Sequence, residues 1–195
     1  DMSGENPSQK SYYVSDEWYQ SLVDGYQDWQ HPEAEITDLN TRDLIRRLLE
    51  KEACLLDETR LDDWLALYVP ECAYWVPASL NQGDPRKEIA VCFDDRRRLE
   101  DRIFRLQNDF AWSQRPASRT ARILSGITAY QSKYEDVIMV RSSFFTTEFH
   151  DGDWRKYTGW YGHRLRKSSE NWLIEVKQVN LIDCDQNLRN LSVIL

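Results

Sequence analysis

The chain has 195 residues, of which 41% are hydrophobic, so we expect one domain large enough to bury a core. Its net charge of -8 argues against nucleic acid as a ligand, because phosphate binding needs a basic face. No apolar run approaches the roughly 18 residues of a membrane span, and the first residues lack the pattern of a signal peptide, so we expect a cytoplasmic protein with no membrane partner.

Residues 1–37 are predicted to form an N-terminal arm, and residues 38–195 a single domain. The arm is polar, but aromatic residues interrupt it, whereas a disordered tail would be poor in them. We expect a short helix over residues 16–27 that packs on the domain or on a neighbouring chain. A loosely ordered extension is the alternative.

Three helices are predicted at the start of the domain. Apolar residues recur at helical spacing over residues 40–57, with charges between them. A second, short helix starts at Leu61 and ends at Pro70, and a short strand over residues 73–76 follows it. The third helix covers residues 94–109.

The second half of the domain is predicted to be a series of strands. Runs rich in β-branched and aromatic residues cover 123–130, 137–149, 154–167 and 172–183, and turn-forming residues separate them. Such junctions indicate hairpins, and consecutive hairpins make an antiparallel sheet. The chain is therefore predicted to be an α+β protein in which the helices pack against this sheet.

The last strand predicts that the sheet is strongly curved. Its apolar residues fall on even positions at Trp172, Ile174 and Val176, but on odd positions at Val179 and Leu181. A change of phase within a strand indicates a β-bulge, which bends the sheet.

Histidines limit the metal chemistry of the chain. A Rieske cluster needs two histidines, and a mononuclear iron site needs two more, but the chain has only His31, His150 and His163. A single triad of His150, His163 and an Asp stays open, although the positions of both histidines favour structural roles. The four cysteines lie far apart and are predicted to be reduced and mostly buried. We therefore expect no metal, cofactor or catalytic site in this chain.

A catalytic pocket is the minority interpretation. A cone-shaped α+β fold can hold an active site at its open end, built from a carboxylate or histidine with tyrosines. The candidates here are Asp63, Tyr68, Tyr74, Trp75 and His163. No convergent acid–base pair is evident among them, and core packing explains Tyr68 equally well.

Two segments are candidates for a subunit interface. Residues 94–105 are dense in charge, and the two interpretations, a solvated helix face and an arginine-rich contact surface, have equal weight. The end of the chain is apolar at Leu191, Val193, Ile194 and Leu195, so it must be buried in its own domain or under a partner. The candidate interface residues are Arg97, Arg98, Arg102, Arg119, Arg189, Leu191 and Leu195.

The sequence of residues 181–191, Leu-Ile-Asp-Cys-Asp-Gln-Asn-Leu-Arg-Asn-Leu, resembles the C-terminal end of the small (beta) subunits of bacterial aromatic-ring-hydroxylating dioxygenases. Further similar segments are residues 52–57, 61–68, 74–77, 94–102 and 119–123. This resemblance implies a nuclear transport factor-like cone, in which three helices pack into a strongly curved antiparallel sheet.

The resemblance also implies a function. In that family the large (alpha) subunit carries the Rieske [2Fe-2S] cluster and the mononuclear Fe(II), and the small subunit carries neither. The two usually assemble as an α3β3 hexamer, which receives electrons from NAD(P)H through a reductase and often a ferredoxin. We therefore expect a non-catalytic small subunit that supports assembly in the degradation of aromatic compounds. The alternatives are a stand-alone cone-fold isomerase, dehydratase or cyclase, and a homo-oligomeric binding module.

Overall fold

Helices precede most of the sheet in the computed structural model, which describes residues 14–81, 83–112, 116–186, 191 and 193–195. The helices are α1 (Asp16–Gly25), the 3-10 helix η2 (Pro32–Ala34), α2 (Leu39–Asp57), α3 (Leu61–Leu65) and α4 (Arg96–Trp112). The strands are β1 (Tyr68–Pro77), β2 (Ala90–Asp95), β3 (Arg119–Gln131), β4 (Val137–His150), β5 (Asp153–Ser168) and β6 (Asn171–Leu181). This order confirms the α+β class.

The strands form one sheet in the order β2-β1-β6-β5-β4-β3. Four of the neighbouring pairs are antiparallel, as predicted, but β1 and β6 are parallel, so the prediction of a wholly antiparallel sheet is wrong there. The long stretch of chain between β1 and β6 can return in either direction, and no hairpin constrains it. β2 was not predicted, and β1 starts earlier than expected, with Pro70 inside it at an irregular point of the β1–β6 pairing.

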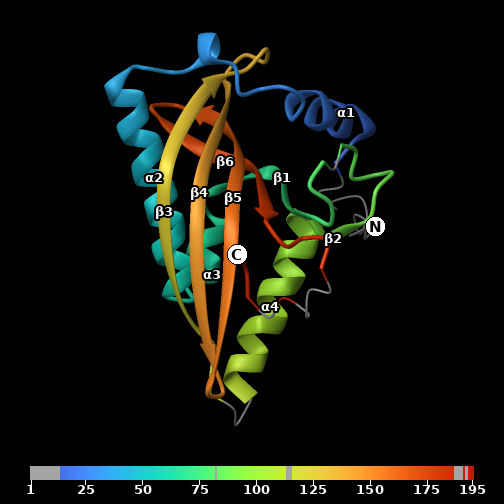
Figure 1. Cartoon of the computed structure of the whole chain (residues 1–195), viewed down its shortest axis with the longest axis vertical. Helices are drawn as coiled ribbons and strands as arrows, with labels where there is room; N and C mark the ends of the chain where they lie inside the picture. The colour runs from blue at the N-terminus through green and yellow to red at the C-terminus, as the bar shows by residue number, and fades with distance from the viewer. Residues whose placement is uncertain (1–13, 82, 113–115, 187–190, 192) are drawn as a thin grey trace, which may run out of the picture.

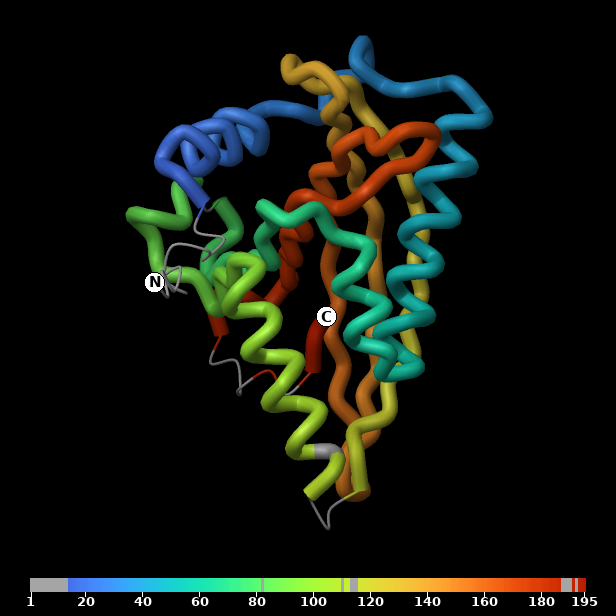
Figure 2. Tube along the Cα trace, turned by 180° about the vertical axis from the view of Figure 1, so that it is seen from behind, coloured from blue at the N-terminus to red at the C-terminus, as the bar shows by residue number. Residues whose placement is uncertain are grey.

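One face of the sheet is concave and faces α2, α3 and α4 (Figure 2). The main core lies between them. From α2 it receives Ile45, Leu49 and Leu56, which share one side of the helix. The Asp38 side chain caps the first turn of α2 by accepting a hydrogen bond from the backbone N–H of Thr41 at 2.8 Å.

The other face is covered at its β1–β6 end by α1 (Figure 1). Trp18, Leu22 and Val23 of α1 pack there against Trp75 and Val176. The short helix expected over residues 16–27 is thus confirmed, and it packs on the sheet of its own chain. The contact between α1 and the sheet also includes a hydrogen bond, which the Trp18 indole N–H donates to the Glu175 carboxylate at 3.2 Å.

The predicted bulge in the last strand is confirmed and lies at Glu175. Arg164 of β5 pairs with Val176, but Leu165 pairs with Ile174, so Glu175 is the extra residue. Ile174 consequently belongs to the main core, whereas Val176 lies under α1 on the opposite face. Beyond the bulge, the odd-numbered residues of β6 face the main core.

The apolar C-terminal segment is buried in its own domain, the first of the two locations expected for it. The exposed fraction is 4% for Ile194 and 0% for Leu195, and the segment ends between the helices on the concave side (Figure 2). The Leu195 backbone N–H donates to the Tyr74 hydroxyl at 3.0 Å, and the Arg122 guanidinium donates to the carbonyl of Ile194.

Candidate functional site

Five polar side chains meet in the main core on the concave side of the sheet; we call them the Glu52 cluster. Its centre is the Glu52 carboxylate, which is 2% exposed. Its Oε2 lies 2.8 Å from His163 Nε2. Its Oε1 accepts hydrogen bonds from Lys177 Nζ at 3.0 Å, Trp64 Nε1 at 3.1 Å and the Tyr68 hydroxyl at 3.3 Å.

Local structure explains how these residues come together. Glu52 shares the buried side of α2 with Ile45, Leu49 and Leu56, at helical spacing. Lys177 is paired with His163 in the β5–β6 register, and both side chains reach the concave side. Lys177 does so because the bulge at Glu175 has shifted the phase of β6.

Burial and charge act against each other in the Glu52 cluster. Burial alone would raise the pKa of Glu52, but the nearby positive charge of Lys177 and the contact with His163 hold this pKa well below its ordinary value. The pKa of Lys177 is lowered to about 8, because the lowering effect of burial exceeds the raising effect of the Glu52 carboxylate. Burial and the negative charge of Glu52 both raise the pKa of Tyr68 well above its ordinary value. Glu52 is therefore held ionised.

The interior around the Glu52 cluster is filled by the protein. Tyr161 stacks on Phe144 with ring centroids 4.1 Å apart, and Lys177 Nζ lies 4.4 Å from the centre of the Tyr161 ring. A cavity beside Arg122 and Ile194 has a volume of about 30 Å³. That is room for no more than a water or two, whereas small-molecule sites commonly measure about 300–1,000 Å³.

Three of the five predicted pocket residues face this interior. Tyr68 and His163 belong to the Glu52 cluster, and Tyr74 binds the C-terminal segment. Asp63 is exposed and pairs with Arg60 at 2.8 Å, and Trp75 lies on the opposite face under α1.

Sequence reasoning missed Glu52 and Lys177. The signal for Glu52 was a carboxylate on the apolar side of a predicted helix. The signal for Lys177 was its place in the last strand: like the apolar residues Val179 and Leu181, it has an odd number and so falls on the same face as they do.

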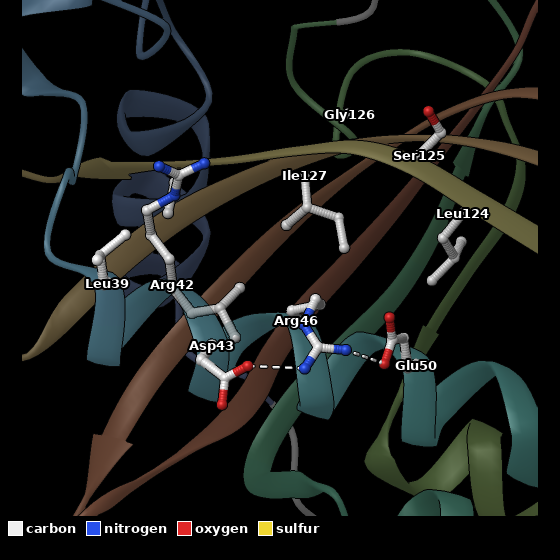
Figure 3. A pocket seen from close by; sticks show the side chains of 11 residues that line it. Leu39, Arg42, Asp43, Arg46, Glu50, Leu124, Ser125, Gly126 and Ile127 are labelled. Carbon is white, nitrogen blue, oxygen red and sulfur yellow. Dashed lines mark hydrogen bonds and ion pairs between the residues drawn. The ribbon is translucent and has the colours of Figure 1, made fainter.

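A hollow of about 510 Å³ lies elsewhere, between α2 and β3 (Figure 3). Arg46 pairs there with Asp43 at 2.7 Å and with Glu50 at 2.6 Å, so these charges neutralise one another along the helix. The other residues that line this hollow are mainly aliphatic, and Ser125 carries the single hydroxyl group among them. The groove contains no His, Cys or Tyr that could act as an acid or base.

The other histidines give no metal site. His31 is exposed and lies 3.3 Å from Asp28. Within the described parts of the chain, no three His, Cys, Asp or Glu side chains are placed to hold a metal ion. The cysteines there are unpaired; Cys72 and Cys184 are buried as predicted, while Cys54 is exposed.

The predicted interface residues lie in different environments. Arg97 and Arg98 are exposed on α4, and Arg119 is exposed on β3. Arg102 binds Asp94 at 2.6 Å and Cys92 Sγ at 3.1 Å, and Arg98 donates to the carbonyl of Phe93 at 3.1 Å. Leu195 is enclosed in the core, and Leu191 is half-buried against it. Arg189 lies outside the described residues.

No helix in the part of the chain that the structure describes is long and apolar enough to cross a membrane.

Comparisons of this chain with known proteins all point to one protein family. The family model of the ring hydroxylating beta subunit matches residues 51–186. The small oxygenase component of the p-cumate 2,3-dioxygenase system of Pseudomonas putida is 35% identical over 65% of this chain and 71% of its own length. The beta subunit of benzoate 1,2-dioxygenase of Acinetobacter baylyi is 32% identical over 70% of this chain and 83% of its own.

A solved structure agrees with the sequence relatives. The beta subunit of benzoate 1,2-dioxygenase from Burkholderia mallei matches 82% of this chain and 99% of its own, with a TM-score of 0.66 and 25% identity. The predicted cone of helices inside a curved sheet is thereby confirmed, apart from the parallel pairing of β1 and β6.

Proposed function

The chain belongs to the family of ring-hydroxylating beta subunits, and from this we propose that it is a non-catalytic small subunit of the terminal oxygenase component of an aromatic-ring dioxygenase. Its role is to support assembly of the large subunits that carry the iron centres. The large subunit holds the Rieske [2Fe-2S] cluster and the mononuclear Fe(II), and this chain holds neither.

The closed interior is the observation that carries the non-catalytic role. The Glu52 cluster has the acid and base groups that a cone-fold enzyme would use, but all five of its side chains are buried in the main core. Its four other members bind the Glu52 carboxylate and not a ligand. The Glu52 cluster therefore stabilises the fold, and the redox chemistry belongs to the partner.

The substrate class follows from the relatives. Cumate and benzoate, for which they are named, are aromatic carboxylic acids. We propose that the complete oxygenase hydroxylates a substrate of this class. The assembly is an α3β3 hexamer in the cytoplasm, and NAD(P)H supplies its electrons through a reductase and often a ferredoxin.

The exposed arginines of α4 are proposed as one contact with the large subunit. Arg97 and Arg98 lie at the start of the helix, outside the core, and arginine is enriched at interfaces because its planar group pairs with carboxylates. Arg102 and Leu195 are left out of this contact because they are less accessible: Arg102 is partly buried against Asp94, and Leu195 is enclosed in the core. Arg98 also donates to the carbonyl of Phe93 at 3.1 Å, but it stays exposed.

Purification of the chain with and without its large subunit tests this proposal. The lone chain is expected to contain no stoichiometric iron, to show no Rieske absorption and to turn over no aromatic acid. The co-expressed pair is expected to form a complex of equal numbers of both subunits in native mass spectrometry. Iron or turnover in the lone chain would contradict the proposal and favour the stand-alone enzyme.

A further inference from the structure

A hollow of about 380 Å³ lies on the outer side of the sheet, between the residues that follow α1, the strands β5 and β6, and the loop after β1. Three half-buried aromatic residues, Tyr26, Trp29 and Trp160, line it together with Gln178 of β6, which is 5% exposed. Small-molecule sites commonly measure about 300–1,000 Å³, so this space is large enough for a small ligand. We call it the amide hollow.

The pairing of β5 with β6 builds the floor of the amide hollow. Trp160 is paired with Asn180, and Gly162 with Gln178, and these even-numbered residues lie on the side of the sheet opposite the main core. A methyl group at Gly162 would lie 3.2 Å from Tyr26 and from the Gln178 side-chain oxygen, and 3.3 Å from Trp160. The absence of a side chain at Gly162 therefore lets the two rings and the amide lie close together.

The amide groups of the hollow have few partners within the chain. The Asn180 NH2 group donates to the Gln178 side-chain oxygen at 2.9 Å, which leaves the Gln178 NH2 group without a hydrogen-bond partner among the described residues. The side chains of Gln27, Gln30 and Asn81 also line the hollow, and they make no hydrogen bond within the described part of the chain. A polar group as buried as Gln178 normally has its hydrogen bonds satisfied, so its NH2 group must find an acceptor in the hollow.

The lining also defines the charge of a ligand. Among the described residues that line the hollow, Asp28 is the only charged one, so a carboxylate or phosphate would have no cation to pair with. A cation is disfavoured as well, because the Arg141 guanidinium already lies 4.6 Å from the centre of the Trp160 ring. The ligand that fits this lining is therefore uncharged.

The chemistry of the lining narrows the class further. Amide groups both donate and accept hydrogen bonds, as hydroxyl groups do. Aromatic side chains pack against the apolar face of a ring, and the ring centres of Trp29 and Trp160 are 6.4 Å apart. Aromatic rings beside several amides with unused hydrogen-bonding groups match a ring that carries hydroxyl groups.

We propose that the amide hollow is a binding site for an uncharged, hydroxylated ring. Trp29 and Trp160 pack on the apolar part of this ligand, and the amides of Gln178 and Asn180 bind its hydroxyl groups. A phenolic ring and a sugar ring share this chemistry. The inference goes beyond the proposed function and does not rest on it, because the aromatic acids of that reaction carry a charge for which the lining offers no partner.

Isothermal titration calorimetry of the purified chain with resorcinol and with methyl β-glucoside tests the site. At least one of these uncharged probes is expected to bind with a dissociation constant of about 1 mM or below. Benzoate and tetramethylammonium, the anionic and cationic probes, should give no measurable heat of binding. Tighter binding of resorcinol identifies a phenolic ligand, and tighter binding of the glucoside identifies a sugar.

Three substitutions assign the binding to the amide hollow. Trp160→Ala removes a ring and Asn180→Ala removes an amide, and each should weaken binding about tenfold or more. Trp154→Ala is the matched control, because Trp154 belongs to the same strand as Trp160, is 69% exposed and lies outside the hollow. It should leave the dissociation constant unchanged.

A further variant tests the role of charge by a gain of binding. Gln30→Lys adds a cation to the lining and should admit 4-hydroxybenzoate, which the wild type should exclude. Circular dichroism confirms that each variant is folded. A chain that binds neither hydroxylated probe would overturn the proposal. So would Trp160→Ala and Asn180→Ala variants that bind like the wild type, or benzoate or tetramethylammonium that binds as tightly as the hydroxylated probes.

Discussion

Replacement of Glu52 by alanine is expected to lower the free energy of unfolding by about 3–5 kcal/mol, the usual effect of removing one partner from a buried ion pair. Lys177 is 1% exposed and would be left without the carboxylate that it contacts at 3.0 Å. The hydrogen-bond donors of Trp64 and Tyr68 would lose their acceptor as well. Urea unfolding followed by circular dichroism measures the change.

Two further variants separate the effect of burial from that of charge. Glu50→Ala removes a carboxylate from the exposed side of the same helix and should change stability little. Adding Lys177→Met to Glu52→Ala should recover part of the lost stability, because the unpaired buried charge is then gone. Equal effects of Glu52→Ala and Glu50→Ala would show that the Glu52 cluster does not stabilise the fold.

Deletion of residues 193–195 is expected to give insoluble protein or a chain that no longer assembles. Ile194 and Leu195 are almost fully enclosed, and burial of such a side chain contributes about 1.5–3 kcal/mol. The loss of both approaches the 5–15 kcal/mol that stabilise a typical domain. The hydrogen bonds to Tyr74 and Arg122 are lost too.

A point variant keeps this prediction measurable if the deletion does not fold. Leu195→Ala should lower the unfolding free energy by about 2–5 kcal/mol, because it leaves a cavity in the core. Leu80→Ala, at an exposed leucine, is the matched control and should have little effect. A soluble deletion variant with an unchanged urea midpoint would mean that the C-terminal segment contributes nothing to the core.

Local patterns were sufficient to predict most of the elements. Helical spacing of apolar residues located α2 and α4, and alternation between turn signals located β3 to β6. The change of phase in β6 even indicated the bulge, because a strand with one buried face must keep its apolar residues on that face. β2 was missed because its short apolar stretch runs directly into charged residues.

Contacts between distant segments could not be predicted in the same way. The pairing of Glu52 with Lys177 depends on the bulge at Glu175 and on the position of α2 across the sheet. The direction of β1 relative to β6 is likewise decided by packing over a long connection. For the C-terminal segment, apolar composition required burial but did not say whether its own core or a partner would provide it.

Turnover per assembled, iron-loaded complex tests the central claim most directly, that this chain acts through assembly and not through its interior. Tyr68→Phe removes one hydroxyl from the Glu52 cluster, 3.3 Å from the carboxylate, and keeps the ring that packs on Trp64. With iron content held equal, the variant complex should hydroxylate its aromatic substrate at the rate of the wild type. Loss of turnover in a fully assembled, iron-loaded Tyr68→Phe complex would contradict the claim and place catalysis in this chain.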